Sequence, residues 1–365
     1  MSRNLVLAAS LAAPLLLVGG TAALAGQPAA ASPAGADVAS PAATAKSDPP
    51  MLGIRWEKGN EPRPAASSKK GSAAFTYQGG KIMSSVTTKA IFWGPSWANA
   101  SFVGDKIGGL DAWYAGWSNN SLYAQTGDEW TDTVNGGHTV GSAANTYQGF
   151  VVDLSTPSSN SSKLLAEVCS LAAAGKITLD PDGNGYYPIY TDIKPGGYCA
   201  YHSYGTCTVN GTPIPVQFGF FFNTDASAGC SSNDPRTAQT NPPLSFGLAS
   251  LADSSAHEIS EARSDPASPG AWRGPGGAEV GDICTSAYNV DSSGIPVYVS
   301  MPPPKGYKPP SSAAYPSPAN NYLWHLQGEW SNLAYAAAQA GSAYSHGSRI
   351  LPDNAGVPGC IDGDL

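Results

Sequence analysis

The spacing of apolar residues along the chain predicts both strands and helices. Short apolar runs bounded by glycine, proline and polar residues predict strands at 85–92, 146–154, 185–193 and 214–222. Apolar residues at helical spacing predict helices at 105–123, 161–174 and about 322–340. A further helix is predicted between the proline pair at 242–243 and Pro266. This order of elements predicts an α+β fold, although the same order suits other folds.

The same pattern divides the chain into three parts. Residues 1–25 have a basic start, an apolar core and a small-residue cleavage site, which together predict a secretory signal peptide. Residues 26–74 are rich in Ala, Pro, Ser and Gly, so we expect a disordered linker or pro-segment there. Aromatic residues recur from 75 onward, and we interpret 75–365 as one folded domain.

Composition narrows the class of protein. The formal net charge is −8 and only 13% of the residues are charged, which disfavours binding to nucleic acid or to an anionic membrane surface. The predicted signal is the only apolar run of that length, so no membrane anchor is expected once it is cleaved. Six cysteines fit an oxidising compartment, and 42 glycines with 31 prolines favour a loop-rich, disulfide-stabilised fold. We therefore expect a secreted, extracellular protein.

The segment AHEISEARSDP, 256–266, carries the strongest chemical signal. His257 and Glu261 are four residues apart, so on a helix they share one face and can hold one metal ion. Glu258 lies about 100° around the helix, where a general base for a metal-bound water would stand. The pattern resembles the zinc-peptidase motif H-E-x-x-H, with glutamate in place of the second histidine. Ordinary surface carboxylates beside one histidine are the alternative interpretation.

A third ligand must come from another segment. Glu279 and Asp282 lie in a glycine-rich loop, and Glu279 follows Glu261 by 18 residues, enough for the chain to turn and return beside the helix. Alternatively, both carboxylates accept backbone N–H bonds in a turn. One imidazole with two carboxylates makes zinc the first choice, and manganese and calcium remain candidates. Calcium would favour a structural role.

Two further acids flank the motif. Asp265 precedes Pro266 at the end of the predicted helix, where an Asp-Pro turn is the favoured role. Asp253 is one turn before His257 and could hold the free ring nitrogen of that histidine, or it could be a plain exposed helix residue.

The segment GYCAYHS, 197–203, clusters aromatic and imidazole groups beside a cysteine. In a hydrolase, His202 or Tyr201 could donate a hydrogen bond to a developing oxyanion. Packing near a disulfide is the alternative. The chain contains no G-x-S-x-G nucleophile elbow, no phosphate-binding glycine loop with lysine and no C-x-x-C.

Several segments together resemble the EXORDIUM-like, or phosphate-induced protein 1, family. They are YQGGKIMSSVTTKAIFWG (77–94), YCAYHS (198–203), SLADSSAHEISEARSDP (250–266), AWRGPGGAEVGDIC (271–284) and LQGEWSN (326–332). The resemblance covers most of 75–365 in the same order and implies a secreted protein associated with the cell wall. It also implies that Cys284 pairs with Cys360. A Cys199–Cys207 disulfide around His202 is a further expectation.

Motif and resemblance together predict a single zincin-like domain with a mixed β-sheet, a metal-bearing helix and a C-terminal helix. The predicted function is that of a zinc-dependent hydrolase of metallopeptidase type, in which a metal-activated water cleaves a peptide or protein substrate. The alternative is a non-catalytic extracellular protein with a structural metal ion, whose aromatic surface could contact cell-wall polysaccharide.

Overall fold

The computed structural model describes residues 48–61, 74–238, 244–290, 293, 295–309, 322–342, 344–346, 349–351 and 358–363. All of them belong to the unit Ala43–Leu365. The predicted signal peptide, most of the segment 26–74 and the proline pair at 242–243 lie outside the described residues. In the part of the chain that is described, no helix is long and apolar enough to cross a membrane.

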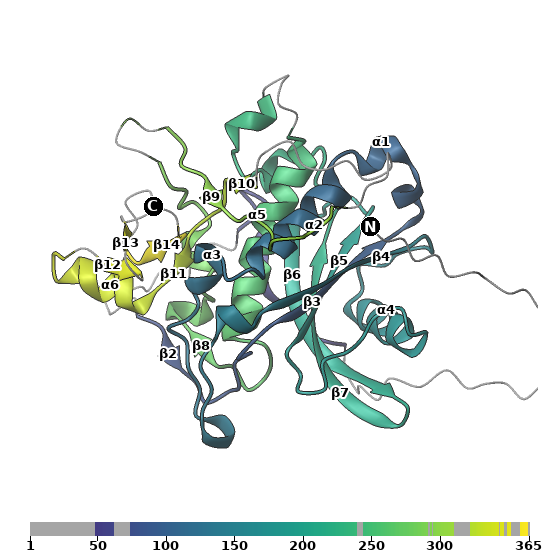
Figure 1. The fold of residues 1–365 in the computed structure, drawn as a ribbon, viewed down its shortest axis with the longest axis horizontal. Coiled ribbons are helices and arrows are strands. Elements are labelled where there is room, and N and C mark those ends of the chain that lie inside the picture. Colours follow the sequence, from purple (N-terminus) through teal and green to yellow (C-terminus); the bar gives the residue numbers. More distant parts are fainter. Residues whose placement is uncertain are drawn as a thin grey trace, which may run out of the picture. The chain divides into compact units, whose positions relative to one another are not determined.

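A mixed six-stranded sheet forms the centre of this unit (Figure 1). Its strands are β1 (Leu52–Trp56), β3 (Thr87–Trp93), β4 (Thr146–Asp153), β5 (Gly185–Thr191), β6 (Tyr198–Val209) and β7 (Thr212–Phe221), in the order β1-β6-β7-β5-β3-β4. The four neighbouring strands β7, β5, β3 and β4 are parallel. At the other end, β6 pairs antiparallel with β7, and β1 pairs antiparallel with β6. β6 and β7 form a hairpin whose two turn residues, Asn210 and Gly211, have positive φ, as this turn type requires.

Helices cover both faces of the sheet. The helices are α1 (Ala100–Val103), α2 (Lys106–Trp117), α3 (Leu122–Gln125), α4 (Ser161–Ala173), α5 (Phe246–Ser264) and α6 (Asn332–Gln339). Of these, α6 lies apart from the sheet and packs against the C-terminal residues 360–361. α2 and α5 pack with Ala90 and Phe92 of β3, whereas α4 packs with Ile91 and Trp93 of the same strand. Because successive side chains of a strand point to opposite faces, the sheet supports two separate cores.

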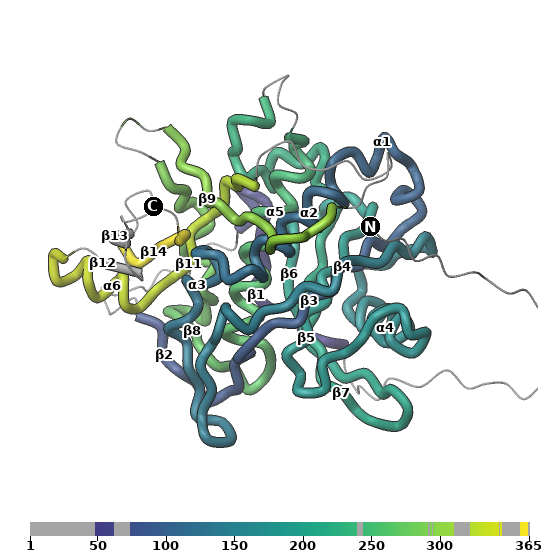
Figure 2. Tube along the Cα trace, viewed as in Figure 1, coloured from purple at the N-terminus to yellow at the C-terminus, as the bar shows by residue number. Residues whose placement is uncertain are grey.

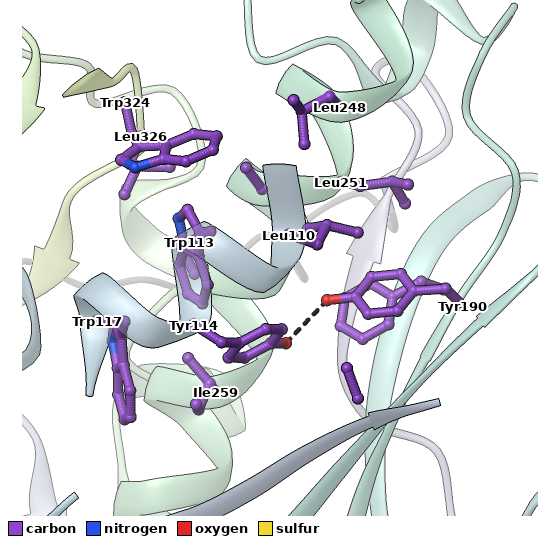
Figure 3. Close-up of a cluster of buried hydrophobic side chains, with 14 of the residues drawn as sticks. Leu110, Trp113, Tyr114, Trp117, Tyr190, Leu248, Leu251, Ile259, Trp324 and Leu326 are labelled. Carbon is purple, nitrogen blue, oxygen red and sulfur yellow. Dashed lines mark hydrogen bonds between the residues drawn. The ribbon is translucent and has the colours of Figure 1, made fainter. Parts of the chain in front are cut away.

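The core between the sheet and the α2–α5 pair is strongly aromatic (Figure 3). Trp113 and Tyr114 of α2 are fully buried, and the Tyr114 hydroxyl lies 2.8 Å from the hydroxyl of Tyr190 on β5. Tyr190 also lies 2.6 Å from the Ser255 hydroxyl of α5. These hydrogen bonds join α2, β5 and α5, so the helix carrying the H-E-x-x-E motif is held firmly against the sheet.

Most predicted elements are confirmed, but the helix predicted near the C-terminus needs a correction. The predicted strands correspond to β3, β4, β5 and β7. The helix predicted at 105–123 corresponds to α2 followed by the short α3, the helix at 161–174 to α4, and the helix before Pro266 to α5. The late helix is shorter than 322–340 and begins at Asn332, capped by Ser331. Residues before it instead form two short strands that pair with distant segments, which are tertiary contacts that the local spacing of apolar residues does not encode.

Short two-stranded ladders complete the described structure. β2 (Thr76–Tyr77) pairs with β8 (Trp272–Arg273), β9 (Val299–Ser300) with β10 (Leu323–Trp324), β11 (Glu329–Trp330) with β14 (Cys360–Ile361), and β12 (Tyr344–His346) with β13 (Arg349–Leu351).

The expected disorder of 26–74 is wrong for the part of it that the structure describes. Residues 52–56 form β1 and pair with β6 at the edge of the sheet. The side chain of Arg55 is buried there beside Asp253. The apolar run LGIRW was too short to stand out within a segment otherwise rich in Ala, Pro and Ser.

Three disulfides stabilise the unit, and one of them was predicted. Cys284–Cys360 is confirmed. The expected Cys199–Cys207 pair is wrong, because the structure joins Cys169 to Cys207 and Cys199 to Cys230. Cys199 and Cys207 both lie on β6, where eight residues of extended chain separate them by about 26 Å. No disulfide can span that distance.

A half-buried acid, Glu129, which contacts the start of α6, makes the stability of the fold depend on pH. Glu129 accepts hydrogen bonds from the backbone N–H groups of Asn332 and Leu333, yet burial raises its pKa from 4.5 to about 7. The folded state therefore binds this proton more tightly than the unfolded state, and stability falls as pH rises from about 4.5 to 7. We expect wild type to lose about 2 kcal/mol more than Glu129→Gln between pH 5 and pH 8 in urea unfolding. Equal losses in the two proteins would contradict this assignment.

Candidate metal centre

Helix α5 presents the H-E-x-x-E residues inside the protein. The helix begins after Ser245, whose side chain accepts a hydrogen bond from the Leu248 N–H, and every residue from Gly247 to Ser264 is buried. His257, Glu258 and Glu261 are each fully buried. A surface helix with exposed glutamates, the alternative considered from the sequence, is therefore excluded. Buried ionisable groups need partners or an ion, because burying an unpaired charge is very costly.

Strand β6 brings His202 against this helix. Its Nδ1 lies 3.4 Å from Glu258 Oε2 and 3.6 Å from Glu261 Oε2. Its Nε2 lies 3.3 Å from Glu279 Oε2. On the other side of Glu261, His257 Nε2 lies 3.2 Å from Oε1 and 4.0 Å from Asp282 Oδ1. Glu261 thus stands between two imidazoles.

Two groups of three side chains could hold a metal ion. The first, called here the His202 set, consists of His202, Glu258 and Glu261; the second, the His257 set, consists of His257, Glu261 and Asp282. Within each set the donor atoms lie within 4.8 Å of one another. The predicted ligands His257, Glu261 and Asp282 are therefore brought together, and His202 is brought to the same place from β6.

The chemistry of the His202 set fits a divalent metal ion. Among the described residues, no hydrogen-bond partner is found for either ring nitrogen of His202, for either oxygen of Glu258 or for Glu261 Oε2. Buried polar atoms in native proteins are nearly always satisfied, so a group of converging orphaned donors is the pattern that an ion would complete. Imidazole nitrogen with carboxylate oxygen suits zinc or another first-row metal.

Gln327 controls the ring of His257. Arg55 donates to the side-chain oxygen of Gln327, which leaves the Gln327 amide nitrogen facing the ring. This nitrogen donates to the Gly281 carbonyl at 3.0 Å and lies 3.1 Å from His257 Nδ1. A metal ligand must be a neutral imidazole, and in the neutral ring an amide N–H at this position leaves Nδ1 unprotonated and places the proton on Nε2, pointing toward Glu261. In this arrangement the Nε2 proton points toward Glu261 Oε1 at 3.2 Å, although Nε2, like the ring nitrogens of His202, has no hydrogen-bond partner among the described residues. A protonated Nε2 disfavours the His257 set.

Glu279 supports His202 from outside the set. Its Oε2 faces His202 Nε2, and its Oε1 lies 3.3 Å from Arg273 Nη2. Arg273 Nη2 also lies 2.5 Å from Asp265 Oδ2, and Asp265 Oδ1 accepts a hydrogen bond from the Ala271 N–H. The helix-end role expected for Asp265 is present, and this acid also positions Arg273. A carboxylate behind a ligating imidazole orients the ring and makes it a better ligand.

The acids of the centre are perturbed by burial. Burial raises the pKa of Glu258 to about 7 and that of Asp282 to about 6. Burial also raises the pKa of Glu279 well above its ordinary value. Burial alone would lower the pKa of His202, but the facing carboxylates, Glu279 first, raise it. A divalent cation would favour the ionised form of all three acids.

Two sequence-based expectations for this centre need correction. Tyr201 cannot steady an oxyanion here, because it is adjacent to His202 on β6 and points to the opposite face, into the α4 core. Its hydroxyl lies 3.5 Å from the Ser159 carbonyl. Asp253 does not hold His257; it accepts hydrogen bonds from Tyr288 and from the Gln327 N–H instead.

Sequence reasoning also missed two residues of the centre. Arg55 lies 198 residues before Asp253, and Gln327 lies 74 residues after it. At these separations neither residue forms a local sequence motif with α5. Arg55 gave one weak signal, as a single charge in an otherwise apolar run.

In comparisons with known proteins, no family model matches the chain, and neither a curated protein nor a solved structure shows significant similarity to it. The function must therefore be argued from the centre itself.

Proposed function

We propose that this protein is a secreted, metal-dependent hydrolase of metallopeptidase type, with zinc as the resident ion. The observation that carries the proposal is the convergence of orphaned, fully buried donor atoms from His202, Glu258 and Glu261. The three disulfides fit an oxidising, extracellular setting. The zincin-like arrangement and membership of the EXORDIUM-like family are part of this proposal, and they rest on the motifs quoted above.

The His202 set would hold the ion, which when bound would acidify water and polarise a substrate carbonyl. Around it, His257 faces Glu261 Oε1 with its Nε2, 3.2 Å away, and so limits the movement of that carboxylate. Glu279 holds the ring of His202. Asp282 is the one acid of the centre whose side chain is partly exposed, at 31%. It is therefore the group that can exchange a proton with solvent, and we assign it as the proton acceptor.

Metal content tests the centre directly. We expect about one zinc ion per chain in wild type by elemental mass spectrometry, and less than about 0.1 in His202→Ala, because the only nitrogen donor of the set is lost. His138→Ala is the matched control, since His138 contacts Asp132 and no residue of the centre. Full zinc retention in His202→Ala would contradict the His202 set.

Glu258→Gln separates the two donor sets. With the His202 set as the site, this variant should lose zinc and fall to background in cleavage of a quenched-fluorescence peptide library. If the variant keeps zinc but loses turnover, the ion is bound by the His257 set instead. Glu258 would then be the general base, as the sequence motif predicts. Unchanged zinc and unchanged turnover would exclude both assignments.

A specific observation favours a second candidate function, that of a non-catalytic extracellular protein with a structural ion. All three donors of the His202 set are fully buried, so a substrate would reach an ion there only after part of the chain moved away. A structural ion predicts that chelation destabilises the fold and that no peptide in the library is cleaved, whereas a catalytic ion predicts cleavage that stops on chelation and returns with added zinc.

A further inference from the structure

The N-terminal strand β1 lies directly against the donor side chains. A Cβ atom placed on Gly53 would be 1.8 Å from Glu261 Oε2 and 2.8 Å from His202 Cε1. Only glycine can bring its backbone this close, and its φ of +46° interrupts the regular strand at that point. Figure 2 shows β1, in purple, beside β6 and next to α5. β1 is therefore what separates this side of the centre from solvent.

The attachment of β1 to the sheet is short and irregular. β1 is an edge strand, and it pairs only with β6, antiparallel, through Leu52↔His202, Arg55↔Ala200 and Trp56↔Tyr198. The register shifts between each of these pairs. Without β1, the edge of β6 beside His202 would present free backbone N–H and C=O groups, which is the surface that an extended peptide joins by strand addition.

The side chain of Arg55, two residues after Gly53, enters a charged pocket beside this edge. The guanidinium of Arg55 is buried and pairs with Asp253 and with the side-chain oxygen of Gln327. It also lies 3.3 Å from the Tyr288 hydroxyl, which in turn donates to Asp253 at 2.9 Å. We call the group Asp253, Tyr288 and Gln327 the arginine pocket. Its buried carboxylate and planar donors and acceptors suit a guanidinium better than any neutral side chain.

We propose that the edge of β6 beside His202 is a binding site for extended peptides that carry arginine two residues after a glycine, and that in the intact chain the segment Leu52–Trp56 occupies this site. The inference rests on the proposed hydrolase function and names its substrate class. The glycine lies against the donor side chains, and the arginine enters the arginine pocket. β1 is then a substrate-like segment that must leave before another peptide can bind.

The test uses the full chain with Gly53→Ala, because the added methyl group collides with Glu261 and should displace β1. Gly59→Ala is the matched control: Gly59 also has positive φ, at +90°, but nothing lies within 4 Å of its Cβ position. Hydrogen exchange of the β6 amides reports displacement. The probe is a fluorescent peptide with the sequence of residues 49–58, PPMLGIRWEK, and a partner peptide has alanine in place of its arginine.

We expect Gly53→Ala to expose the β6 amides and to bind the probe, with the alanine peptide bound at least about 30-fold more weakly. Gly59→Ala and wild type should bind the probe much more weakly than Gly53→Ala, since β1 competes for the edge and leaves it open in only a small fraction of molecules. If Gly53→Ala does not fold, Arg55→Ala is used in the same assay. Exposed β6 amides without probe binding, or equal binding of both peptides, would overturn the proposal. Protection of β6 in every variant would also overturn it, because β1 would then be a permanent strand.

Peptide binding is scored without turnover, so the two proposals can fail separately. Probe that binds through its arginine but is never cleaved, with zinc present, would support the peptide edge and contradict the hydrolase function. Cleavage of library peptides regardless of arginine would support the hydrolase function and contradict the arginine pocket.

Discussion

Chelation is expected to lower the midpoint of thermal unfolding by about 6 °C. An ion present at about 1,000 times its dissociation constant stabilises the folded state by about 4 kcal/mol. For a unit of this size, Ala43–Leu365, each kcal/mol corresponds to about 1.5 °C. The effect should be large because the ion's removal leaves Glu258 and Glu261 buried beside each other without a divalent cation. Differential scanning calorimetry with and without EDTA measures it.

Glu261→Gln is the control for this prediction, because Glu261 belongs to both candidate donor sets. The variant should unfold at the temperature of the chelated wild type and should not respond to EDTA. A wild-type protein that contains zinc but unfolds at the same temperature with and without EDTA would contradict a buried metal centre.

Asp253→Asn is expected to lower the free energy of unfolding by about 3–5 kcal/mol, because it breaks a buried ion pair and leaves the Arg55 charge uncompensated. Asp253 is fully buried and is the common acceptor for Arg55, Tyr288 and the Gln327 N–H. The loss should also release Gln327 from its position beside His257. Urea unfolding measures the free energy, and it should be done on the zinc-loaded protein.

A more exposed ion pair of the same chain provides the comparison. Lys106 and Asp225 are 2.6 Å apart, but the Asp225 side chain is 38% exposed. Asp225→Asn should therefore cost no more than about 1 kcal/mol. Equal costs for the two variants would show that burial of Asp253 adds nothing, which would contradict the role given to the Arg55 network.

The sequence alone predicted the elements whose signals are local. The amphipathic spacing of α4 and the apolar runs of β3, β4, β5 and β7 survive in the structure almost residue for residue. The helix carrying His257, Glu258 and Glu261 was predicted for the same reason, because residues one turn apart on a helix must share a face whatever surrounds them. Mixed α+β class and disulfide content also followed from pattern and composition.

The tertiary structure decided everything that joins distant segments. His202 was noted in the sequence, but only the pairing of β6 with β1 and β7, with α5 packed on that face, places His202 against Glu258 and Glu261. The same pairing turns Tyr201 away. Arg55 and Gln327 reach the centre from opposite ends of the chain, and no local pattern encodes such a meeting. Backbone geometry over a few residues determines helices and strands, whereas a buried centre depends on which side chains the packed core leaves facing one another.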